Sequence, residues 1–74
     1  TQIMNAVVKV CQDFGANELE VGTGNSSFDQ LAFYQRNGFR FYDVKRDFFT
    51  TYYDEEIYEN NIQCIDKLLL ERPI

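Results

Sequence analysis

The sequence predicts an α/β fold in which a helix, a strand, a second helix and two further strands follow one another in a single small domain, residues 1–74. Three patterns lead to this prediction. Apolar residues recur at helical spacing in the first segment, and polar and apolar residues alternate in the second. A serine followed three residues later by a glutamine then opens the third segment. Three strands are too few for a closed domain, so a partial one is expected.

The first helix is predicted from residue 3 to residue 14. Four apolar residues share one face at the spacing i, i+4, i+7 and i+11: Ile3, Val7, Val10 and Phe14. This apolar stripe is widened by Met4, Ala6 and Cys11. The pattern is typical of an amphipathic helix of about three to four turns. Gly15 can adopt the left-handed conformation that ends such a helix.

A short strand is predicted at Glu18–Gly22, where polar and apolar residues alternate and Leu19 and Val21 share one face. The stretch GTGNSS that follows has the composition of a turn. Ser27 and Gln30 then fit a capping box, in which the serine hydroxyl accepts a bond from a helical N–H and the glutamine reaches back. This pattern predicts the start of the second helix.

The Asn-Gly pair at 37–38 ends the second helix, and two strands are predicted after it, at 39–44 and 62–70. Pro73 is expected to stop the last strand. Between the two strands, residues 45–61 are acidic and aromatic without a clean period. We interpret them as an irregular excursion with room for one helical turn, and most simply as a solvated charged loop.

The charge of the chain argues against two classes of partner. Seven basic residues stand against twelve acidic ones, which gives a net charge of −5. That sign repels phosphate backbones and anionic membranes, so neither nucleic acid nor a lipid surface is an expected partner. The sequence contains no apolar run near the roughly 18 residues that a membrane span needs, and no secretory leader is visible.

The residue types present also limit the chemistry. With no histidine in the chain, a Cys/His zinc site and any Ser-His or Cys-His nucleophile pair are excluded, and no metal site is predicted. Cys11 and Cys64 are too few and too far apart for a disulfide framework. We interpret them as reduced core thiols, which predicts a cytoplasmic location.

The glycines of GTGNSS do not make a phosphate loop. The stretch lacks the lysine and spacing of the Walker motif and the third glycine of the dinucleotide fingerprint. A strand-to-helix turn with a serine cap accounts adequately for Gly22, Gly24 and Ser27.

The next stretch is more specific. LAFYQRNGFR resembles a signature of the GNAT superfamily, the acetyl-CoA-dependent N-acetyltransferases, in which a helical tyrosine is followed four residues later by Gly-Phe. The longer stretch LEVGTGNSSFDQLAFYQRNGFR is similar to the strand-turn-helix-turn-strand unit in the later half of that family's fold. ENNIQCIDKLLL is similar to its final strand. The resemblance extends in order over essentially the whole chain.

The resemblance implies roles for three residues. In the family, an amine attacks the thioester of acetyl-CoA, and a helical tyrosine commonly protonates the departing thiolate; the matching residue is Tyr34. Many members carry an asparagine seven residues before that tyrosine, where its amide binds the pantetheine arm. Here Ser27 stands at that distance, and Asn25 stands nine residues before Tyr34. Either Ser27 substitutes for the asparagine, or the turn has another shape and Asn25 reaches the cofactor.

The resemblance also implies the architecture: the C-terminal half of a GNAT fold, with a mixed three-stranded sheet and two helices. The last strand, 62–70, should pair antiparallel with 18–22, and 39–44 should lie outermost. The family's pyrophosphate loop and first strands precede the helix with which this chain begins, so they are expected to be missing. The chain is then part of an enzyme that acetylates a primary amine. The alternative is an inactive module that self-associates or binds another protein through the exposed sheet edge.

Overall fold

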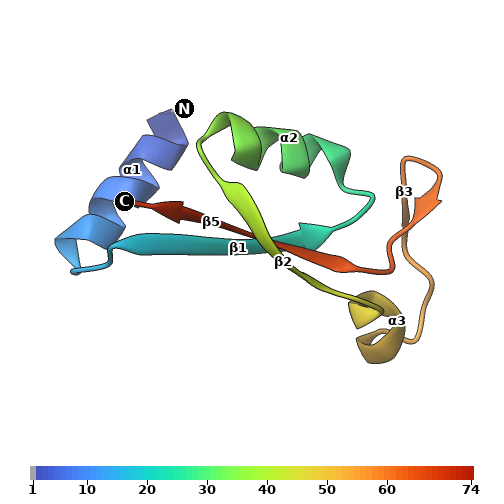
Figure 1. Cartoon of the computed structure of the whole chain (residues 1–74). Helices are drawn as coiled ribbons and strands as arrows, with labels where there is room; N and C mark the ends of the chain where they lie inside the picture. Colours follow the sequence, from blue (N-terminus) through green and yellow to red (C-terminus); the bar gives the residue numbers. More distant parts are fainter. Residues whose placement is uncertain (1) are drawn as a thin grey trace.

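The computed structural model describes residues 2–74, and the expectation that Thr1 lies at the edge of the first helix falls outside this part. Within it, no helix is long and apolar enough to cross a membrane. Figure 1 shows the arrangement of the elements. In chain order they are α1 (Gln2–Asp13), β1 (Glu18–Gly24), α2 (Phe28–Arg36), β2 (Arg40–Lys45), α3 (Phe48–Tyr52), β3 (Tyr58–Glu59), β4 (Ile62–Gln63) and β5 (Lys67–Pro73).

The main sheet has three strands in the order β1-β5-β2, as predicted. Both pairs of neighbouring strands are antiparallel, so the sheet is antiparallel and not mixed as predicted. The reason is that β5 lies between β1 and β2, which run in the same direction but do not touch. Val21 of β1 and Phe41 of β2 both face Leu70 of β5 in the register, and β2 contains an irregularity after Phe41.

The core lies between the sheet and the two longer helices. Met4 of α1, Phe39 before β2 and Leu70 of β5 are its buried apolar residues. Partly buried residues pack around them: Val8, Leu19, Val21, Leu31, Phe33 and Tyr34. Because these come from α1, α2 and one face of the strands, both helices cover the same face of the sheet (Figure 1). The short helix α3 lies at one end of the opposite face, where the Phe49 ring approaches Gly24 (Figure 1). Among the described residues, no helix covers the rest of that face.

Helix α1 forms where it was predicted, but its four-residue stripe does not face the core. Met4 and Val8 pack on the sheet, while Ile3, Val7, Val10 and Phe14 are exposed. The helix therefore has two adjacent apolar stripes, and a three-stranded sheet covers only one of them. Phe14 is 87% exposed, which leaves a large apolar surface open.

The last predicted strand is broken. Residues 62–63 form β4, which pairs with β3 in a separate hairpin, and β5 begins only at Lys67. The two-residue loop of the hairpin is Asn60-Asn61, and both residues have positive φ, as a type I′ turn requires. Strand β5 also runs past residue 70 and ends at Pro73, which tolerates a terminal position because it lacks a backbone donor. The excursion before the hairpin contains the single helical turn for which the sequence left room, α3.

Other local predictions hold. Gly15 and Gly38 both have positive φ, at the ends of α1 and α2 respectively. The glycines of β1 serve a different need, close approach. A Cβ at Gly22 would lie 2.3 Å from Lys67 Cε, and one at Gly24 would lie 2.3 Å from Cys64 Sγ. Packing against the buried Cys64 thus explains Gly24, whereas the flexible Lys67 side chain could move away from a Cβ at Gly22.

We predict that Gly24→Ala destabilises the chain by about 1–3 kcal/mol, because the added methyl group must displace the buried Cys64 thiol. Urea unfolding measures the effect. A double-mutant cycle with Cys64→Ala is the control, since removing the thiol should make Gly24→Ala much milder. Additive effects of the two substitutions would show that this contact does not explain the glycine.

Candidate functional site

The candidate site is built where the turn after β1 meets the segment that leads into β5; we call residues 25–27 and 63–66 together the turn junction. Asn25 holds it. Its Oδ1 accepts bonds from the backbone N–H groups of Ile65 (2.7 Å) and Asp66 (3.0 Å), and its Nδ2 donates to the Gln63 carbonyl (3.1 Å). The Asn25 backbone N–H donates to the Asp66 carbonyl at 3.0 Å. One residue therefore satisfies the backbone of the stretch where the predicted last strand breaks.

Ser27 does not form the predicted capping box. It occupies the N-cap position without a side-chain cap bond, and its hydroxyl donates instead to Glu59 Oε1 at 2.7 Å. Gln30 accepts a 2.6 Å bond from the Thr23 hydroxyl rather than reaching back to Ser27. A hydrogen bond to a carboxylate is stronger than one to a neutral group, which explains why Ser27 turns toward the hairpin.

The β3–β4 hairpin is thereby attached to the turn at two points. Glu59 accepts the Ser27 bond, and Asn60 Nδ2 donates to the Ser26 carbonyl at 2.8 Å. The Ser26 side chain is fully buried and its Oγ has no hydrogen-bond partner among the described residues. The hairpin closes over the start of α2, so the excursion is fixed to the turn and is not a loose charged loop.

These bonds limit what Asn25 and Ser27 can still offer a ligand. An amide side chain can form up to four hydrogen bonds, and Asn25 already forms three. One Nδ2 hydrogen of Asn25 is left. The Ser27 hydroxyl donates its hydrogen to Glu59, and its oxygen can still accept a hydrogen bond. The two alternatives drawn from the sequence thus differ in chemistry: Asn25 can only donate, and Ser27 can only accept while the Glu59 bond persists.

Tyr34 lies on α2, away from the turn junction. Seven residues separate it from Ser27, nearly two helical turns or roughly 10 Å along the axis. Its half-buried ring packs against Phe33 at 5.7 Å and Phe39 at 5.4 Å between centroids. Its hydroxyl forms no hydrogen bond with residues 2–74. The ring is thus held by packing, while the hydroxyl remains available as a donor.

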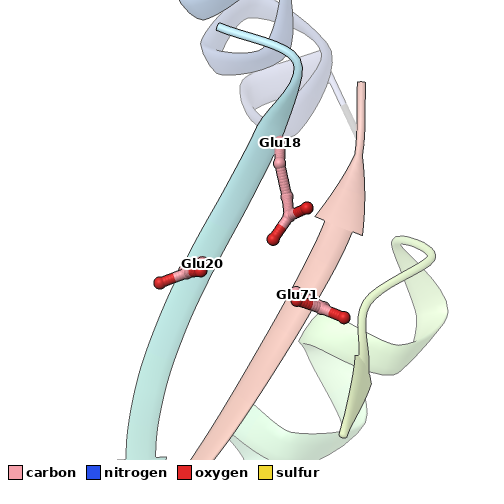
Figure 2. Close-up of side chains that lie close together, drawn as sticks. All are labelled: Glu18, Glu20 and Glu71. Atoms are coloured by element: carbon pink, nitrogen blue, oxygen red, sulfur yellow. The ribbon is translucent and has the colours of Figure 1, made fainter. Parts of the chain in front are cut away.

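A third group of polar residues was not identified from the sequence. Glu18 and Glu20 of β1 and Glu71 of β5 bring carboxylate oxygens within 4.8 Å of one another on the uncovered face of the sheet (Figure 2). The register explains this, because Glu20 lies directly opposite Glu71. The predicted last strand ended at residue 70, so this pairing was missed.

The charges of this cluster perturb their neighbours. A hydrogen bond with Glu71, together with its negative charge, raises the pKa of Glu18 above its ordinary value. Desolvation and the nearby Glu20 carboxylate raise the pKa of Tyr42. Three carboxylates could ligate a hard divalent cation, but Glu18 and Glu20 are exposed and Glu71 is only partly buried, and like charges opposite each other destabilise a sheet.

Known proteins resemble this chain in sequence and in fold. No protein-family model matches the chain. A Bacillus subtilis protein named Uncharacterized N-acetyltransferase YvbK is 45% identical over 69 residues, which is 93% of this chain and 44% of that protein.

Two solved structures superpose on nearly the entire chain. An IAA acetyltransferase from Bacillus cereus gives a TM-score of 0.93 at 42% identity, over 99% of this chain and 49% of that one. A GNAT family acetyltransferase from Elizabethkingia anophelis with acetyl-CoA bound gives a TM-score of 0.93 at 40% identity, over 99% and 48%. The chain thus spans about half the length of the relatives that it matches.

We predict that Asn25→Ala loosens the turn junction and lowers the free energy of unfolding by about 1–3 kcal/mol, because buried backbone groups lose their partner. Hydrogen exchange should show lost protection at the amides of Ile65 and Asp66, which bind Asn25 Oδ1. Asn25→Asp keeps the acceptor and should be milder. Asn5→Ala, on an exposed part of α1, is the control. Full protection of both amides in Asn25→Ala would contradict this role.

Proposed function

Because the chain corresponds in sequence and in fold to the C-terminal half of a GNAT acetyltransferase, we propose that it is part of an enzyme that transfers an acetyl group from acetyl-CoA to a primary amine. The observation that carries the proposal is the 40–42% identity to acetyltransferase structures over 99% of the chain, together with the acetyl-CoA bound in one of them. In this proposal the remaining strands and the pyrophosphate loop come from the half that the chain does not match.

The free edge of β1 is the proposed place for the cofactor arm. Within residues 2–74, β1 pairs with β5 along one edge only, so the backbone N–H and C=O groups of its other edge have no strand partner. An extended chain with amide groups, such as pantetheine, can bind these groups as an added strand does. The end of β1 leads into the turn junction, so Asn25 or Ser27 is proposed to contact the same arm.

Tyr34 is proposed as the general acid. A neutral amine attacks the acetyl carbonyl and forms the C–N bond, and the C–S bond breaks with its electron pair leaving on the CoA sulfur. The nitrogen then loses a proton to water, and the Tyr34 hydroxyl donates a proton to the thiolate. A phenol has a reference pKa of about 10 and a thiol one of about 8.5, so a phenol is still protonated when a thiolate departs. The packing of the Tyr34 ring and its free hydroxyl both support this role, because the donor is oriented but not occupied.

A second candidate is a self-associating module without catalysis. Two surfaces favour it: the free edge of β1 and the exposed stripe of α1, where Ile3 and Phe14 are 78% and 87% exposed. An unpaired strand edge is a template for another chain, and covering large apolar side chains is worth about 1.5–3 kcal/mol each. For the chain on its own, we propose self-association through these surfaces.

We also propose a cytoplasmic location, supported by the two free cysteines. Cys11 and Cys64 are not joined to each other, and Cys64 is buried against Gly24. Thiols in this state suit a reducing compartment.

We predict that Tyr34→Phe, in a protein that joins this chain to the missing half of the domain, lowers kcat by roughly 10²-fold with little change in the KM for acetyl-CoA. Phenylalanine keeps the ring packing and removes only the donor. Steady-state kinetics across a pH range measure the effect, and Tyr52→Phe, an exposed position on α3, is the control. Unchanged turnover in Tyr34→Phe would show that Tyr34 is a packing residue.

For the 74-residue chain alone we predict a two-fold dimer at tens of micromolar, measured by light scattering after size exclusion. Substituting the exposed apolar residues Val7 and Phe14 by glutamate should shift the population toward the monomer, whereas Asp29→Asn should not. A sharp monomer mass for the unmodified chain, with well-dispersed amide signals, would overturn the self-association proposal.

A further inference from the structure

Ser27 occupies the N-cap position of α2, yet its hydroxyl does not cap the helix. The Ser27 carbonyl accepts the first helical bond, from the Leu31 N–H at 3.0 Å, as an N-cap residue does. The hydroxyl oxygen of such a residue normally accepts a bond from the N–H of the second or third helical residue, here Asp29 or Gln30. Among residues 2–74 it accepts neither. The Ser27 hydroxyl thus has a choice of two partners, a helical amide and the Glu59 carboxylate, and it binds the carboxylate.

Both residues of the capping box are held in other contacts. The Ser27 hydroxyl donates to Glu59 Oε1 at 2.7 Å, and Gln30 Oε1 accepts the hydroxyl of the buried Thr23 at 2.6 Å. A carboxylate is a stronger acceptor than a neutral group, which favours Glu59 as the partner of the serine. The Thr23 bond holds Gln30 away from the serine backbone, so two independent contacts favour the uncapped arrangement.

The hairpin β3–β4 fixes the position of the Glu59 carboxylate. Its tight loop consists of Asn60 and Asn61, both with positive φ, so the residues around the loop have little freedom. Asn60 Nδ2 donates to the Ser26 carbonyl at 2.8 Å. Two consecutive hairpin residues therefore bind two consecutive turn residues, and the backbone as well as the hydrogen bond holds Glu59 at Ser27.

The contact with Glu59 decides what Ser27 offers to a ligand. A hydroxyl has one hydrogen and two lone pairs. Because the hydrogen is directed to Glu59 and no helical amide uses the oxygen, Ser27 offers an acceptor. If Ser27 capped α2, a helical amide would occupy the oxygen and the hydrogen would be offered instead. The bond that Asn25 still has to offer is a donor, so the turn carries one acceptor and one donor, which matches the N–H and C=O groups of an amide.

From this arrangement we propose that Glu59 is a positioning residue for the cofactor arm. It holds the Ser27 hydroxyl as an acceptor for an amide N–H of the arm, while Asn25 donates to a carbonyl of the same arm. The proposal rests on the proposed acetyltransferase function for the identity of the arm. Glu59 itself does not contact the cofactor and acts only through Ser27.

The first test concerns the start of α2 in the absence of any cofactor. Hydrogen exchange of the ¹⁵N-labelled chain reports whether the amides of Asp29 and Gln30 are capped. In Glu59→Ala the released Ser27 hydroxyl should cap α2, so exchange at the amide that it binds should slow by about fivefold, the size of a typical N-cap bond. The double variant Glu59→Ala/Ser27→Ala has no hydroxyl at this position and should lose the slowing.

Two variants control for acceptor geometry and for charge. Glu59→Gln keeps an acceptor oxygen at the same place, so its exchange at α2 should equal that of the unmodified chain. Glu55→Ala removes another exposed acid of the same excursion and should also leave exchange at α2 unchanged. Unchanged or faster exchange in Glu59→Ala, or equal slowing with and without the Ser27 hydroxyl, would overturn the role of Glu59.

The second test measures kinetics in the protein that includes the missing half. Glu59→Ala should raise the KM for acetyl-CoA by about fivefold and leave kcat within about twofold, because the arm loses an oriented acceptor but the reacting atoms are untouched. Ser27→Ala should raise this KM by a similar factor, and the double variant should raise it no further, because Glu59 acts through Ser27. Glu59→Gln should retain the unmodified KM.

The outcomes separate this proposal from the acetyltransferase function. An unchanged KM in Glu59→Ala, or effects of the Glu59 and Ser27 substitutions that multiply in the double variant, would contradict the positioning role. Absence of any acetylation by the unmodified protein would contradict the proposed enzyme and with it the identity of the arm. The exchange experiment decides independently whether Glu59 holds the Ser27 hydroxyl away from α2.

Discussion

Asn25 makes four hydrogen bonds to residues 63–66, from the end of β4 to the start of β5, and the arrangement of the chain after β2 depends on them. Without these bonds, residues 62–70 are apolar enough to continue as one strand. With them, the chain leaves the separate β3–β4 hairpin after Gln63 and enters the main sheet as β5 at Lys67. One polar side chain therefore fixes both the position of the central strand and the position of the excursion.

The two faces of the sheet are covered unequally, and this difference bears on the proposed function. Two helices cover one face of the sheet, while most of the other face, apart from the end beside α3, and the outer edge of β1 are open among the described residues. The open surfaces carry features that a complete domain rarely leaves exposed, namely an apolar stripe on α1 and a row of opposed carboxylates on β1 and β5 (Figure 2). Relatives twice as long as this chain offer an explanation, since their other half has the size needed to cover such surfaces.

The parts of the fold that depend on local pattern could be predicted from the sequence. Periodicity identified α1 and α2, alternation identified β1, and Gly15 and Gly38 marked the helix ends. The resemblance around Tyr34 identified the fold family and the strand order.

Features that depend on contacts distant in sequence could not be predicted. The break after Gln63 arises from Asn25, thirty-eight residues away. Ser27 does not cap α2 with its side chain, because its hydroxyl binds the Glu59 carboxylate, a stronger acceptor. Periodicity could not tell which of the two stripes of α1 would face the sheet. The hairpin is attached to the turn through Glu59 and Asn60, contacts that composition could not show, so composition alone suggested only a solvated loop.

The central claim is that the end of β1, the turn junction and α2 form one side of an acetyl-CoA site that needs a second half for tight binding. Titration of the ¹⁵N-labelled chain with acetyl-CoA tests this most directly. The account predicts weak binding, with a dissociation constant of about 1 mM or higher, and shifts concentrated at residues 22–27 and along α2 to Tyr34. Low-micromolar binding, or shifts confined to other parts of the chain, would contradict it.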